Sequence, residues 1–207
     1  MQQTINVKQH RSAFSKRNLS LAEWFVFSIP GLWPVPEKEL PRLATSYSQG
    51  DPRGTVDVAS CRMALESLRH RGWLQIVDKS VLACLRQKVA SLQCDPPVYG
   101  FPELGDVDFT DKGAEVFRGL SSDLYGRYFF SEAVVADEQS TGKTVYTARK
   151  SRVETIVNEG WSLGFAVSRT KIGPWCIYWW KVFPSGWRME FFNLSRLAKH
   201  SLVGQSS

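Results

Sequence analysis

Two segments of the chain, residues 59–77 and 107–120, constrain its fold more than any other part. The first, ASCRMALESLRHRGWLQIV, has apolar residues at helical spacing as far as Gly72 and then a short strand-like run. The second, VDFTDKGAEVFRGL, begins with an alternating strand-like run, and Thr110 then caps an amphipathic helix. The two runs predict strands that pair in a small sheet, over which the apolar stripe from Cys61 to Leu68 is buried.

Together these segments resemble the end of a recognition helix, the strands on either side of the wing and the closing helix of a winged-helix domain. The resemblance covers residues 20–125. It implies that the helix at 59–71 enters the major groove of duplex DNA. A further helix, predicted over 79–92, departs from the minimal winged-helix pattern, which has no helix there.

The expected fold class is α+β, in three parts. Residues 1–18 form a basic arm, residues 19–125 a mainly helical winged-helix-like domain, and residues 126–207 a small antiparallel ββαβββ module rich in aromatic residues. A helix is expected in this module at 149–159, and strands at 132–136, 144–148, 161–167, 175–183 and 186–192. The turn signal Pro184-Ser185-Gly186 predicts a hairpin between the last two strands.

Composition narrows the class of protein. Of the 207 residues, 43% are hydrophobic and 22% are charged, as in ordinary globular proteins. No apolar run approaches the roughly 20 residues that span a bilayer. The N-terminal stretch is polar and basic, which is not the pattern of a secretory signal. We therefore expect a cytoplasmic protein that does not enter a membrane.

Residues suited to catalysis or metal binding are scarce. The four cysteines have no metal-finger spacing, and we expect them to be reduced thiols; they are Cys61, Cys84, Cys94 and Cys176. None of the three histidines pairs with a nearby Ser, Cys or carboxylate in a recognisable nucleophile motif. The Gly142-Lys143-Thr144 run has Asp137 where a phosphate loop needs glycine. The sequence indicates no metal and no cofactor. Because distant residues can converge in a fold, an enzyme of unknown class is a third hypothesis, behind the two given below.

The helix at 59–71 is the candidate for contact with duplex DNA. Residues 1–88 contain 13 Lys and Arg against 7 Asp and Glu, a charge of +6 that suits a polyanionic partner. The outward and C-terminal residues of this helix would contact bases and phosphates, and they are Ser60, Arg62, Met63, Ser67, Arg69, His70 and Arg71. The expected function is that of a non-catalytic DNA-binding protein, such as a transcription regulator.

A second hypothesis is a protein-interaction adaptor on the same scaffold, which binds a protein partner or a second copy of itself. Residues 89–125 contain 2 Lys and Arg against 7 Asp and Glu, a charge of −5 that opposes phosphate contacts where the wing would lie. The interaction surface expected under this hypothesis consists of Asp106, Asp108, Trp175, Trp179 and Trp187.

Overall fold

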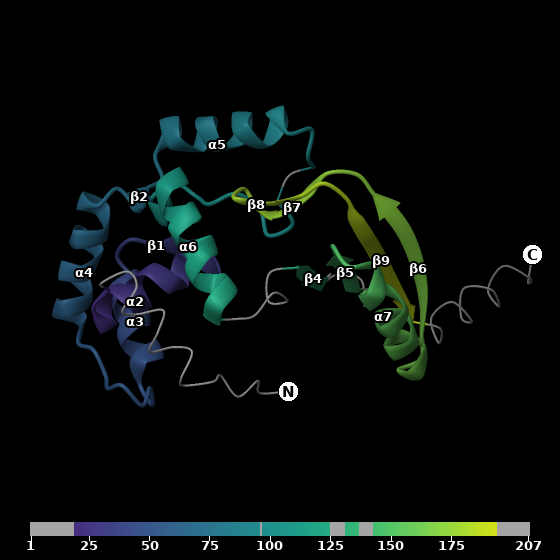
Figure 1. Ribbon diagram of the computed structural model, residues 1–207, viewed down its shortest axis with the longest axis horizontal. Helices are drawn as coiled ribbons and strands as arrows, with labels where there is room; N and C mark the ends of the chain where they lie inside the picture. Colours follow the sequence, from purple (N-terminus) through teal and green to yellow (C-terminus); the bar gives the residue numbers. More distant parts are fainter. Residues whose placement is uncertain (1–18, 96, 125–130, 137–142, 194–207) are drawn as a thin grey trace, which may run out of the picture. The chain divides into compact units, whose positions relative to one another are not determined.

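The computed structural model of the chain describes residues 19–95, 97–124, 131–136 and 143–193 (Figure 1). The chain divides into two compact units: residues 1–87 with 101–127, and residues 88–100 with 128–207. Helices and antiparallel strands occur together, which confirms the α+β class. Sequence analysis assigned residues 88–100 to the N-terminal domain, whereas in the structure they group with the second unit. The expected basic arm lies outside the described residues.

The first unit combines helices with a three-stranded sheet. Its elements in chain order are α2 (Leu21–Ser28), the 3-10 helix η1 (Ile29–Gly31), β1 (Val35–Pro36), α3 (Leu40–Ser48), α4 (Val58–His70), β2 (Leu74–Ile76), the start of α5 (Lys79–Ser91), β3 (Asp106–Phe109) and α6 (Asp111–Leu124).

Local capping signals set the helix boundaries in this unit. The Ser20 hydroxyl accepts a hydrogen bond from the Glu23 backbone N–H, and the Glu23 carboxylate accepts one from the Ser20 N–H, so the two residues form a capping box at the start of α2. The Asp57 carboxylate caps α4 by accepting from the Ser60 N–H at 2.6 Å. Gly72 follows α4 with a φ of +65°, a backbone conformation that favours glycine, and the chain then enters β2.

The sheet of the first unit has the order β1-β3-β2 and is antiparallel. The two strands predicted to pair, β2 and β3, are neighbours in this sheet, and Leu74 lies opposite Phe109. The helices pack around an aromatic centre in which the Phe27 ring lies 5.1 Å from the Phe109 ring and 5.8 Å from the Phe117 ring. The expected apolar stripe of α4 is buried, and its members are Cys61, Ala64, Leu65 and Leu68.

The second unit contains two antiparallel sheets. Its elements are β4 (Glu132–Ala136), β5 (Lys143–Thr147), α7 (Lys150–Ser162), β6 (Phe165–Ile172), β7 (Trp175–Tyr178), β8 (Lys181–Phe183) and β9 (Gly186–Asn193). One sheet has the order β4-β5-β9-β6, and in the other β7 pairs with β8. The core of this unit is formed by α7 together with β5 and β9, and consists of Val145, Val153, Ile156, Met189 and Phe191.

Two expectations for this unit are wrong. The strand predicted over 175–183 is interrupted at Trp179 and Trp180, where the chain turns from β7 into β8. The hairpin predicted at 184–186 does not form, because β9 pairs with β5 and β6 instead of β8. The apolar character of 175–183 reflects burial of a short hairpin, in which Trp175 lies opposite Phe183.

The end of α7 also differs from the expectation. Sequence analysis ended this helix near residue 159 at Gly160 and began a strand at Trp161, but the helix continues to Ser162 and β6 starts at Phe165. Gly160 is inside the helix because it packs against the sheet: a Cβ atom there would lie 2.6 Å from both Phe191 and Val167. The turn into β6 is made at Gly164, whose φ is +80°.

Candidate nucleic-acid interface

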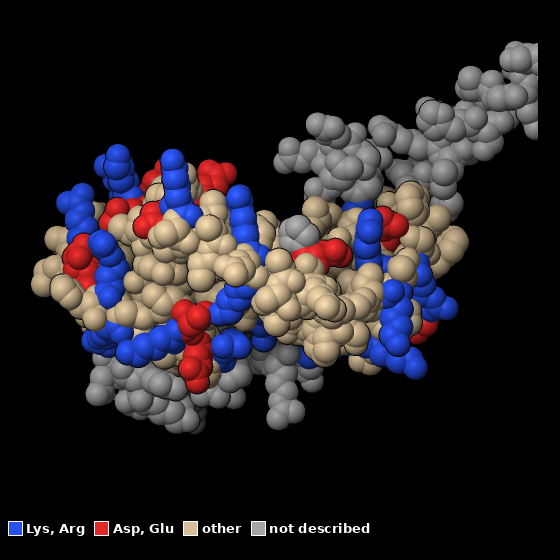
Figure 2. Space-filling view, turned by 90° about the horizontal axis from the view of Figure 1, so that it is seen from above, with Lys and Arg blue, Asp and Glu red and all other residues tan. Residues whose placement is uncertain are grey.

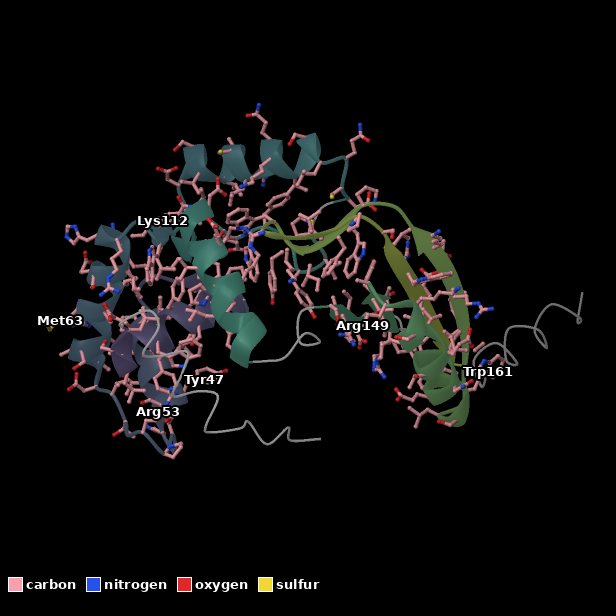
Figure 3. The ribbon with its side chains drawn as sticks, in the orientation of Figure 1. Tyr47, Arg53, Met63, Lys112, Arg149 and Trp161 are labelled. Atoms are coloured by element: carbon pink, nitrogen blue, oxygen red, sulfur yellow. The ribbon has the colours of Figure 1, made fainter. Side chains whose placement is uncertain are left out.

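Helix α4 presents an outward face opposite its buried stripe. The exposed side chains of this face are Ser60, Arg62, Met63, Glu66 and His70. Met63 is 74% exposed, and its side chain points away from the body of the first unit (Figure 3). An exposed, flexible apolar side chain between polar ones is compatible with a face that contacts a partner.

Two of the expected DNA-contacting residues instead hold α4 against α2. The Ser67 hydroxyl donates to Glu23 Oε1 at 2.7 Å, and Arg71 Nη2 donates to the same oxygen at 2.8 Å. The Arg71 guanidinium also lies over the Trp73 ring, 5.3 Å from its centre. Burial of Glu23 opposes its ionisation, but hydrogen bonds from Ser20 and Ser67 and the charge of Arg71 together lower its pKa. Ser67 and Arg71 therefore have structural partners.

Arg69 has two acidic neighbours. Its Nη1 atom lies 3.2 Å from Glu37 Oε1 and 3.4 Å from Glu66 Oε1, and its side chain is 36% exposed. Ion pairs at such partly exposed positions are weak, so Arg69 can exchange a carboxylate for a phosphate at small cost. It remains a candidate phosphate contact, whereas Arg71 is held by a buried carboxylate.

The outward residues of α4 supply chemistry that reads base edges. An Arg such as Arg62 can donate two hydrogen bonds to guanine, and a Ser such as Ser60 can donate or accept. An apolar side chain such as Met63 can contact the methyl group of thymine. Glu66 opposes phosphate but can accept from cytosine. These outward side chains include an acidic and an apolar one beside Arg62 and Ser60. Their types therefore suit contact with bases more than contact with phosphates.

Acidic residues near the expected wing are not all on the surface. Asp106 and Asp108 are 7% and 5% exposed. Asp106 Oδ2 accepts from the Glu103 N–H and Asp108 Oδ1 accepts from the Phe109 N–H, each at 2.7 Å. Both carboxylates therefore serve the backbone around β3, and the expectation that they form an interaction surface is wrong. Their burial also removes them from any phosphate-facing surface.

The segment between β2 and β3 contains α5 where a minimal wing has only a loop. The residues of α5 include Lys79, Arg86 and Lys88 and no Asp or Glu. Lys88 Nζ lies 4.9 Å from the centre of the Trp179 ring, and the Arg86 guanidinium lies 6.0 Å from that of Phe101. On the left part of the face in Figure 2, however, acidic side chains stand among the basic ones, so this face has mixed charge.

The tryptophans expected at an interaction surface are largely internal. Trp175 is 2% exposed, stacks on Phe183 and Tyr146 at 4.8 and 5.7 Å, and donates from Nε1 to the Ser185 carbonyl. Trp179 is 4% exposed. Trp187 is partly buried against the α7 core. The expectation is wrong for Trp175 and Trp179, because both side chains are buried.

Other apolar side chains of the second unit are exposed instead. Trp161 and Leu163, at the end of α7 and just beyond it, are 54% and 73% exposed, and Phe192 of β9 is 44% exposed. Figure 3 shows Trp161 at the margin of this unit. Sequence analysis missed Trp161 and Leu163 because it placed both inside a strand, and only the helix boundary at Ser162 puts them at the surface.

Within the described ranges, no group of three or more His, Cys, Asp or Glu residues is arranged to hold a metal ion. None of the described helices has the length and apolar character that crossing a membrane requires. His10 and His200 lie outside the described residues. No protein-family model, no curated protein and no solved structure matches the chain.

Proposed function

We propose that the chain is a non-catalytic DNA-binding protein, such as a transcription regulator, and that it presents α4 to the major groove of duplex DNA. The proposal depends on the amphipathic character of α4, which has one buried face and one exposed face. Its Cys61–Leu68 stripe is buried in the first unit, while Ser60, Arg62 and Met63 are exposed on the outward side. A helix held in this way can enter the groove without unfolding its own domain.

The element order of the first unit supports a winged-helix-like assignment within this proposal. A helix, a short strand, two helices and a second strand, β2, follow one another; α5 comes next, and then β3, which lies between β1 and β2 in the sheet. Helix α4 leads directly into β2, so the sheet fixes the orientation of its C-terminal end. The long connection from β2 to β3, which contains α5, takes the place of the wing.

Burial of two carboxylates weakens the electrostatic argument against phosphate contact. The acidic stretch at 89–125 was the argument against phosphate contact, and two of its seven carboxylates, those of Asp106 and Asp108, are buried. The basic side chains of α5 lie in the connection between β2 and β3. Phosphate neutralisation by such groups supplies most of the non-specific affinity of DNA-binding proteins.

The experiment is a fluorescence-anisotropy titration of the full chain with labelled random duplex DNA at about 50 and 200 mM salt. We expect binding at the lower salt that weakens at the higher. Arg62→Gln should weaken binding to random duplex DNA several-fold and lower the slope of log affinity against log salt by about one, as expected when one charge contact is lost. Arg169→Gln removes the same charge from the second unit and should leave binding unchanged.

Two results would contradict the proposal. One is the absence of binding at low salt. The other is an equal loss of affinity in Arg62→Gln and Arg169→Gln, because equal losses would assign the interaction to total charge and not to α4. Circular dichroism of both variants verifies that each remains folded.

A second candidate function is a protein-interaction adaptor. It is favoured by the exposed apolar side chains of Trp161, Leu163 and Phe192, since such side chains at a surface suit a protein partner or a second copy of this chain. Co-purification or self-association that is lost in Trp161→Ser with Leu163→Ser, and retained in Arg62→Gln, would support this alternative.

A further inference from the structure

Residues that follow α5 lie against β7 as an additional, irregular edge. The Val98 N–H donates to the Cys176 carbonyl at 2.9 Å, and the Tyr99 N–H donates to the Ile177 carbonyl at 3.3 Å. The Tyr99 ring packs on the Tyr178 ring with their centres 5.5 Å apart. All of these residues belong to the second unit, so the contact is internal to it.

This arrangement brings two cysteine side chains together. The Cys176 thiol donates to the carbonyl of Asp95, the residue next to Cys94, at 3.6 Å, and the Cys94 thiol donates to the Leu92 carbonyl at 3.7 Å. The two thiols lie close enough that each affects the pKa of the other. Both are free thiols in the structure, Cys94 half-buried and Cys176 only 1% exposed. The other two cysteines differ: Cys61 is buried in the first unit and Cys84 is exposed on α5.

We propose that Cys94 and Cys176 form a modification site, a dithiol that converts reversibly to an intramolecular disulfide by exchange with a small-molecule disulfide. Exposure determines which of the two reacts first, because the reagent reaches Cys94 from solvent and Cys176 lies behind it. The second cysteine is already beside the first, so the internal step requires no search through the chain.

The chemistry proceeds in two exchanges. The Cys94 thiolate attacks one sulfur of the reagent; a new S–S bond forms, the reagent's S–S bond breaks, and one half leaves as a thiolate. The Cys176 thiolate then attacks Cys94 Sγ, which forms the protein disulfide and releases the second half. The protein loses two electrons, the reagent gains them, and the two cysteine protons end on the two released thiols. A small dithiol reverses both steps.

The environment slows the first exchange without preventing it. Burial and the nearby Asp95 charge raise the pKa of the Cys94 thiol. Burial, with the nearby Cys94 and Asp95, raises the pKa of Cys176 to about 12. Both thiols are therefore protonated at neutral pH, and the small thiolate fraction limits the rate. Oxidation is expected over hours and not seconds.

The Cys94–Cys176 disulfide would attach the segment 88–100 covalently to β7. Residues 88–100 are an excursion of the chain from the first unit into the second, and the chain returns to the first unit at Phe101. In the reduced protein this excursion is held to β7 by hydrogen bonds and ring contacts. In the oxidised protein it would be held covalently at Cys94.

The experiment incubates the full chain with oxidised glutathione and maps the tryptic peptides without reduction. Each cysteine lies in its own tryptic peptide: residues 54–62, 80–86, 89–112 and 172–181. We expect peptides 89–112 and 172–181 to be joined, with a loss of two titratable thiols per chain. A small dithiol should restore both thiols.

Matched variants locate the bond. Cys84→Ser removes the exposed thiol of α5 and should leave the joined peptides unchanged, whereas Cys94→Ser should abolish them. If the protein is unfolded in denaturant before oxidation, pairing should become random among the four cysteines, so specific pairing in the wild type reports the folded contact. That wild-type measurement does not depend on whether a variant folds.

Other products would overturn the proposal. A lasting glutathione adduct at Cys94 with no joined peptide would show that Cys176 cannot reach it. A link that involves peptide 80–86, within one chain or between two chains, would assign the reactivity to Cys84. Four titratable thiols after prolonged incubation would show that the site does not react.

Discussion

Arg71, just beyond the C-terminal end of α4, donates a 2.8 Å hydrogen bond from Nη2 to Oε1 of Glu23 in the first turn of α2. The same carboxylate oxygen accepts from the Ser67 hydroxyl. Glu23 is only 6% exposed, so its charge is compensated mainly by these protein donors. One carboxylate thus caps its own helix and fixes the helix that we propose contacts DNA.

Glu23→Gln should destabilise the protein by about 1–3 kcal/mol, because it removes a charged acceptor of several hydrogen bonds. The measurement is urea unfolding followed by circular dichroism. The control is Glu154→Gln, since Glu154 forms a 2.7 Å ion pair with Arg169 but its side chain is 70% exposed. That control should change stability by less than about 0.5 kcal/mol. Equal losses in the two variants would contradict the role assigned to Glu23.

Acidic pH should lower the free energy of unfolding, because Glu23 becomes protonated. Burial opposes ionisation of Glu23, but its hydrogen bonds to Ser20 and Ser67 and the charge of Arg71 bring its folded-state pKa below the ordinary value of 4.5. A carboxyl group with a depressed folded pKa contributes stability above its unfolded pKa, and this contribution is lost as pH falls through the folded pKa. The stability difference between wild type and Glu23→Gln should therefore be full near neutral pH and shrink below 4.5. A pH series of unfolding midpoints measures it, and a constant difference would refute the mechanism.

Gly113 of α6 should not tolerate alanine. A Cβ atom at this position would lie 1.8 Å from the Trp73 carbonyl oxygen, a backbone atom that cannot rotate away. Helix propensity favours alanine by ~1 kcal/mol, but a clash with backbone outweighs it, and a net loss of about 1–3 kcal/mol is expected. Gly173→Ala is the control, since nothing lies within 4 Å of its added Cβ. A thermal melt of both variants tests this, and a more stable Gly113→Ala would contradict it.

Local sequence signals sufficed where the structure depends on nearby residues. The Ser20–Glu23 capping box and the Asp57 cap were predictable, because each joins residues three positions apart. Gly113 was not: in the sequence it is a weak point in a helix, and only the close approach of Trp73 explains it. The difference is that caps act within four residues, whereas packing against a distant backbone leaves no local pattern.

Local sequence signals also failed to predict how the strands of the second unit turn and pair. The turn between β7 and β8 contains Trp179 and Trp180 and no Gly, Pro, Asn or Asp, so turn chemistry gave no signal. The partners of β9 are β5 and β6, which are separated from it along the chain by β7 and β8, and such non-sequential strand pairing cannot be read from one sequence. At the candidate site, the outward residues of α4 followed from helical periodicity, but the partners of Ser67 and Arg71 did not, because Glu23 is on another helix.

Glu66 provides a test in which the proposed DNA interface should gain affinity. Its side chain is 62% exposed on the outward face of α4, and it lies 3.4 Å from Arg69. Glu66→Gln removes a carboxylate that would repel phosphate and releases Arg69 from one of its two acidic neighbours. Random duplex DNA should bind roughly two- to fivefold more tightly at low salt, the ~0.3–1 kcal/mol of one surface charge.

The salt dependence of this gain separates a local effect from a general one. The advantage of Glu66→Gln should shrink as salt rises, because screening weakens interactions between exposed charges. Glu154→Gln makes the same change of net charge on α7 of the second unit and should leave affinity for DNA unchanged. An equal gain in both variants would assign the effect to net charge. No gain in Glu66→Gln, with binding otherwise intact, would place the DNA on a surface other than α4.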